Sequence, residues 1–103
     1  MTRPFIAALA LASLAAPAFA ESVPADIAEG RLRGCLLASA TSPTQSDLNA
    51  KVIEARAFCG AQIKRVRENR AAAASTASAK AEAGRKLDAE IAQAVANFSG
   101  LTS

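Results

Sequence analysis

The 103-residue chain contains no histidine, tryptophan or tyrosine, and its only methionine is Met1. Without histidine, a cysteine nucleophile lacks its usual base, and a transition-metal site would need thiolates and carboxylates. The two cysteines form no C-x-x-C motif and are too few for a structural zinc site. The sequence also lacks a glycine-rich phosphate loop and a nucleophile elbow. We therefore expect no enzymatic activity, no metal site and no cofactor.

Large apolar residues are also scarce once the first twenty residues are set aside. The remaining 83 residues contain 16 Val, Ile, Leu and Phe and another 20 Ala. Such a chain forms one small domain at most, with a thin core. Alanine favours helix because it loses no side-chain entropy there, and no strand alternation or hairpin turn is visible. The composition therefore predicts an all-α fold.

The N-terminus has the pattern of a secretory signal peptide. An apolar run over residues 5–16 is too short for a stable membrane anchor. Ala18 and Ala20 then form a small-x-small cleavage site, which favours a cleaved signal over residues 1–20 rather than a buried N-terminal helix. Cleavage after Ala20 leaves a single domain, 21–103, with no transmembrane anchor. The alanine-rich signal indicates a bacterial secretory route, so we expect a periplasmic or secreted protein.

Three groups of residues recur at helical spacing. They are Ala28, Leu32, Cys35 and Ser39; Leu48, Val52, Ala55, Cys59, Ile63 and Val66; and Leu87, Ile91, Ala94, Val95 and Phe98. They predict helices over about 24–40, 46–70 and 82–99. Gly100 is the expected C-cap of the last helix. The alanine-rich stretch 71–81 is either a helical extension or a linker.

The two cysteines lie on the apolar stripes of the first two predicted helices. An exported compartment permits disulfides, and two is an even count. We therefore expect a Cys35–Cys59 bond that joins these helices into a hairpin. The alternative, a reactive thiol at Cys59, is disfavoured because that residue lies on the core stripe.

The disulfide also constrains the loop between these helices. If the second helix began near Pro43, the two cysteines would lie about 16 Å out of register at a rise of 1.5 Å per residue. A longer loop over about 41–45 removes this conflict. It favours a helix start near Ser46 and the capping box Thr44-x-x-Asp47 over the earlier Ser42-x-x-Gln45.

Small residues form a row on the first predicted helix. Gly30, Gly34 and Ala38 lie four residues apart, a spacing that lets another helix approach closely. In a soluble chain such a row is more often accidental than a designed contact.

The second predicted helix carries four cations, Lys64, Arg65, Arg67 and Arg70. They point in directions spread around most of the helix and are interrupted by Glu68, so they do not form one nucleic-acid-binding face. Export also removes nucleic acid as the usual partner. We expect a solvated surface around a core helix, or weak contact with anionic envelope surfaces such as lipid head groups or acidic glycans.

Together these patterns predict a small all-α protein of three helices, a disulfide-linked helical hairpin plus a C-terminal helix. Two functions remain open. The first is an interaction or accessory protein of the bacterial envelope that binds an unknown protein partner, as an inhibitor, immunity protein, chaperone-like protein or assembly subunit. The alternative is a binder of anionic envelope surfaces through segment 64–70. The salt dependence of binding distinguishes these two functions, because electrostatic attraction to a charged surface is screened at high ionic strength.

Overall fold

A computed structural model describes residues 23–102, which contain four helices and no strand. The helices are α2 (Ala25–Ala40), α3 (Leu48–Phe58), α4 (Gly60–Ala73) and α5 (Ala77–Ser99). The predicted all-α fold is therefore confirmed. The predicted signal peptide, with its cleavage site at Ala18 and Ala20, lies outside the described residues.

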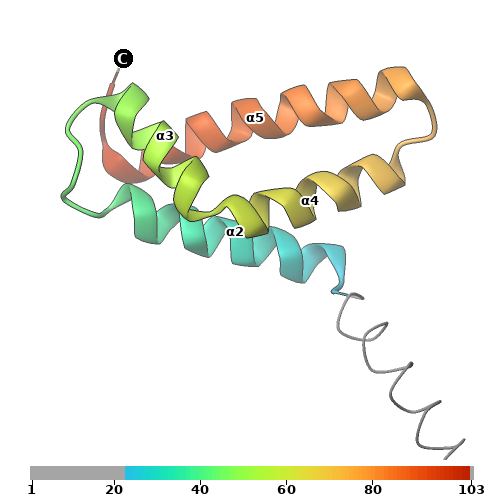
Figure 1. Ribbon diagram of the computed structural model, residues 1–103, viewed down its shortest axis with the longest axis horizontal. Helices are drawn as coiled ribbons and strands as arrows, with labels where there is room; N and C mark the ends of the chain where they lie inside the picture. The colour runs from blue at the N-terminus through green and yellow to red at the C-terminus, as the bar shows by residue number, and fades with distance from the viewer. Residues whose placement is uncertain (1–22, 103) are drawn as a thin grey trace, which may run out of the picture.

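The helices α3 and α4 together act as one bent middle helix. The helix α2 contacts α3, α4 and α5, and α5 contacts both halves of the middle helix. Figure 1 shows α5 running back past α4 and α3, while α2 lies along the opposite, lower edge of the helical body. The arrangement thus agrees with the predicted three helices, except that the second helix is bent.

The bend corrects the prediction of a continuous helix over 46–70. The break lies at Cys59, whose backbone dihedrals are φ −100° and ψ 19°. The next residue is Gly60, and glycine is a poor helix former. Cys59 still donates its amide to the carbonyl of Ala55 at 2.8 Å, and Ile63 donates to Cys59 at 2.9 Å. Hydrogen bonding therefore continues across the junction, and the helix changes direction there.

The start of α3 corrects the capping prediction. The helix begins at Leu48, and the Asp47 carboxylate caps it by accepting a hydrogen bond from the Ala50 amide at 2.9 Å. Thr44 is not the cap, because its hydroxyl donates to Glu54 instead. The loop therefore spans 41–47, which is longer than predicted.

The ambiguous stretch 71–81 is divided between two helices. Its first three residues end α4, and a short turn leads to Thr76, whose side chain caps α5 by accepting from the Ala79 amide at 3.0 Å. The helix α5 thus begins at Ala77, five residues before the predicted start. At its other end Gly100 adopts a left-handed conformation with φ 74°, which confirms the predicted C-cap.

The core lies where the inner faces of all four helices meet. Its buried residues are Ala28, Leu32, Leu36, Ala40, Ala55, Cys59, Ile63, Val66, Leu87, Ile91 and Val95. Most of them belong to the three stripes that the sequence shows. The helix α5 contributes Leu87, Ile91 and Val95 to this core, and three of its eleven residues are alanine.

Candidate interaction surface

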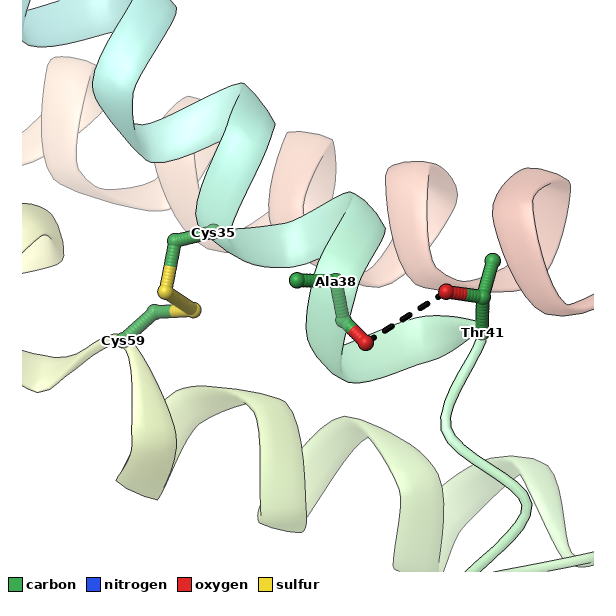
Figure 2. Close-up of a disulfide and its surroundings, with 4 residues drawn as sticks. All are labelled: Cys35, Ala38, Thr41 and Cys59. Atoms are coloured by element: carbon green, nitrogen blue, oxygen red, sulfur yellow. Dashed lines mark hydrogen bonds between the residues drawn. A yellow bond between two sulfur atoms is a disulfide. The ribbon is translucent and has the colours of Figure 1, made fainter.

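The predicted disulfide is formed. Cys35 in the middle of α2 is bonded to Cys59 at the break between α3 and α4, with Cα atoms 5.9 Å apart (Figure 2). Cys59 is completely buried. Both cysteines of the chain are used in this bond, so the reactive-thiol alternative has no free thiol to use.

Two of the four basic residues in segment 64–70 are held by acidic side chains of other helices. Arg70 donates to Glu29 on α2 at 2.8 and 2.9 Å and to Glu90 on α5 at 2.9 and 3.2 Å. Arg67 donates to Asp88 on α5 at 2.8 Å. These two arginines therefore connect helices rather than standing free as surface cations. Of the other two, Lys64 is exposed and Arg65 is half-buried.

These contacts favour the charged forms of Arg70, Asp88 and Glu90. The hydrogen bonds that Arg70 donates to Glu29, and then those that it donates to Glu90, raise the pKa of Arg70. The bond from Arg70 lowers the pKa of Glu90, and bonds from Arg67 and then Arg56 lower that of Asp88. The acidic partners are 40–47 % exposed, so water screens each pair and it stabilises the fold by about 1 kcal/mol or less.

A buried lysine that sequence patterns did not reveal fixes the loop before α3. Lys51 is only 1 % exposed, and its Nζ donates to the carbonyls of Ser39 and Ser42, the hydroxyl of Thr44 and the carboxylate of Glu54. Hydrogen bonds from Thr44 and Lys51 lower the pKa of Glu54. The ammonium satisfies carbonyls at the C-terminal end of α2. The ammonium group of Lys51 finds all of its acceptors within the chain, so we assign Lys51 a structural role.

A groove of about 380 Å³ lies between α2 and α5, and Arg70 and Phe98 are among the residues that line it. Its floor consists of core side chains that are at most 4 % exposed: Leu32, Leu36, Leu87 and Ile91. The accessible apolar lining of the groove therefore comes from half-buried residues such as Ala94 and Phe98.

The large apolar side chains that are exposed lie on α2 and α3. Ile27 and Leu37 on α2 are 45 % and 46 % exposed, and Ile53 and Phe58 on α3 are 69 % and 66 % exposed. Phe58 also borders a hollow of about 260 Å³ beside Ala38 on α2. Single exposed apolar residues are ordinary. Here, however, every large exposed apolar residue within 23–102 lies on two adjacent helices of a chain that has few such residues to bury.

The helix α2 is apolar on two opposite faces. Its inner face buries core residues, whereas the outer face of α2, defined by Ile27, Gly30, Gly34 and Leu37, is exposed. A Cβ atom added at Gly30 or Gly34 would meet nothing within 4 Å. Figure 1 shows the other three helices all on one side of α2. Of the small-residue row seen in the sequence, Gly34 therefore faces away from the rest of the described chain, whereas Gly30 borders the groove between α2 and α5 and Ala38 borders the hollow beside Phe58.

Comparisons with known proteins give no family for this chain. No protein-family model matches it, and neither a curated protein nor a solved structure matches it. Within residues 23–102, no helix has both the length and the apolar character needed to cross a membrane. The same range holds no group of three or more His, Cys, Asp or Glu side chains placed to bind a metal ion. A function must therefore be inferred from the residues of this chain alone.

Proposed function

We propose that this is a small exported interaction or accessory protein of the bacterial envelope, which binds a protein partner through the exposed apolar side chains of α3. One observation carries the proposal: Ile53 and Phe58 are about two-thirds exposed in a chain whose core is thin. Covering a side chain of this size contributes about 1.5–3 kcal/mol. A partner that covers both would gain free energy that the isolated fold leaves unused.

Export is part of this proposal. It is supported by the signal pattern of residues 1–20 and by the disulfide, a bond that persists mainly in oxidising compartments. The role is that of an inhibitor, immunity protein, chaperone-like protein or assembly subunit, without an enzymatic activity of its own. Mass spectrometry of the exported protein should find Glu21 as the first residue. A mature product that retains Met1 would contradict export by this route.

The alternative, binding to anionic lipid head groups or acidic glycans through segment 64–70, has less support. Arg67 and Arg70 are already paired with Asp88, Glu29 and Glu90. That pairing reduces the positive charge that the segment offers to a surface. If the alternative held, binding to envelope material would fall sharply with ionic strength, whereas apolar contacts through α3 would persist at high salt.

Site-specific photo-crosslinking tests the proposed function. A photoreactive phenylalanine analogue at position 58 should form an adduct with an envelope protein, because Phe58 is 66 % exposed. Excess unlabelled wild-type protein should compete the adduct away, and excess Phe58→Ser should not. The matched control places the analogue at Ala89, an exposed position on α5. No adduct at 58, or equal adducts at 58 and 89, would contradict the proposal.

A further inference from the structure

The outer face of α2 has the spacing of a two-helix seam. Ile27, Gly30, Gly34 and Leu37 follow one another at steps of three, four and three, which are the a and d positions of a heptad pattern. All four are exposed, and nothing in the described chain packs on the two glycines. Ile27 and Leu37 provide apolar contacts at the two ends, and the glycines between them let a second helix approach closely.

The charges beside this seam are complementary to those of a second copy. With Ile27 at an a position, Asp26 is the preceding g position and Arg31 the following e position. In a parallel pair, a g residue faces the e residue five positions later on the other helix. Asp26 of each copy would therefore face Arg31 of the other. Both side chains are exposed, and within residues 23–102 neither has an ion pair or a hydrogen bond.

We propose that two copies of this chain associate as a parallel pair through the outer faces of α2. Ile27 and Leu37 form the seam, and two symmetry-related Asp26–Arg31 pairs flank it. An antiparallel pair would place e positions against e positions, so Arg31 would face Arg31 and like charges would repel. The inference goes beyond the proposed function, because the seam uses α2 alone and does not need Ile53 or Phe58 on α3.

A seam with two large apolar side chains per copy is small, so the association is weak and depends on concentration. Sedimentation equilibrium of the disulfide-bonded protein from about 10 µM to about 1 mM spans the range in which such a dimer forms. We expect the average mass to rise from that of the monomer towards twice that value. A monomer mass throughout would overturn the inference, and it would leave crosslinking at position 58 unaffected.

A charge exchange tests the parallel orientation. Asp26→Arg and Arg31→Asp should each weaken self-association by about tenfold or more, since each places like charges together twice. An equimolar mixture of the two variants should dimerise again, because every facing pair is then opposite in charge. The same change at the second flanking arginine, Arg33→Asp, is the control. Position 33 faces Ala38 of the other copy, so this variant should dimerise like wild type.

Two results would overturn the proposed pairing. The first is a mixture of Asp26→Arg and Arg31→Asp that stays monomeric while the wild type dimerises. The second is an Arg33→Asp variant that is weakened as much as Arg31→Asp, since net charge alone would then explain the effect. Circular dichroism of each variant checks that helix content is retained, as expected for three exposed side chains.

Discussion

The helices α2 and α5 are both long and both contact every other part of the helical body, yet they use their apolar residues differently. In α5 the large buried residues lie on one face: Leu87, Ile91 and Val95. In α2 the buried residues Leu32 and Leu36 lie on one face, while Ile27 and Leu37 lie exposed on another. The fold accounts for the apolar residues of α5. It buries only two of the four large apolar residues of α2, and we propose that a second copy of the chain covers the other two, Ile27 and Leu37.

The two helices also differ in how they are attached. The 23-residue α5 is held by packing and by ion pairs through Asp88 and Glu90. The 16-residue α2 is bonded covalently through Cys35 and paired through Glu29. Because α2 leaves two of its four large apolar side chains exposed, it gains less free energy from burial than a helix that buries all of them. The disulfide compensates by fixing its position on the core.

The largest expected effect separates the buried face of α5 from the outer face of α2. Ile91 is 1 % exposed, so Ile91→Ala should lower the free energy of unfolding by about 4 kcal/mol through lost burial and a cavity. Leu37→Ala should change it by about 0.5 kcal/mol or less, as at other surface sites. Urea unfolding of dilute protein measures both. Equal losses would mean that the outer face of α2 belongs to the fold.

The disulfide gives the next largest effect and tests the covalent attachment of α2. Cys35→Ser should lower stability by about 3.5 kcal/mol, the chain-entropy value for its 25-residue loop. In a domain of this size, such a loss lowers the melting temperature by more than about ten degrees. Cys59→Ser should act similarly, and the double variant should be little worse than either single one, since each removes one bond. Unchanged melting after reduction would contradict this role.

A smaller effect is expected from Arg70, which links α2 to α5. The pKa of Glu90 is lowered in the fold, so its stabilising contribution is present above the carboxyl pKa of the unfolded chain. It is lost as the pH falls through the lower folded value. Melting temperatures should therefore fall from about pH 5 downwards, and Arg70→Gln should make this fall shallower. At neutral pH that variant should lose about 1 kcal/mol. If the melting temperature of Arg70→Gln fell with pH as steeply as that of the wild type, the stabilising role of the Arg70–Glu90 pair would be contradicted.

The smallest effect is a gain of stability on the outer face of α2. Because a Cβ at Gly34 meets nothing within 4 Å, Gly34→Ala should stabilise the monomer by about 0.5–1 kcal/mol through helix propensity. Gly84→Ala in α5 is the matched control, where the new Cβ would lie at an ordinary contact distance of 3.5 Å from Arg67. A loss of stability at Gly34 would show that this face is covered within one chain.

Local patterns were sufficient to predict the helices, the C-cap at Gly100 and the disulfide. The helices and the cap follow from the spacing of apolar residues and from the glycine after the last of them. The disulfide follows from the position of each cysteine on an apolar stripe and from a compartment that permits disulfides. The break at Cys59 and the cap at Asp47 were missed. The break interrupts one long apolar stripe, and such a stripe continues across a bend without a visible change in spacing. A loop longer than the predicted one also moved the cap beyond the Thr44 signal.

The candidate surface was less predictable, because a sequence does not say which neighbours a side chain will find. Lys51 looks like any surface lysine until the end of α2 surrounds it with carbonyl oxygens. Arg67 and Arg70 look like free cations until α5 brings Asp88 and Glu90 beside them. The spacing of Ile27 and Leu37 is visible in the sequence. The stripe of Ala28, Leu32 and Ser39 also predicts which face of α2 is buried, and only the positions of the other helices show that none of them covers Ile27 and Leu37 on the opposite face.

Sedimentation equilibrium of Leu37→Glu beside the wild type, at about 1 mM, tests most directly the claim that the outer face of α2 is an interface rather than part of the fold. Leu37 is 46 % exposed and lies in the seam, so the variant should keep its helix content and yet remain a monomer where the wild type dimerises. A variant that unfolds, or one that dimerises like the wild type, would contradict the claim.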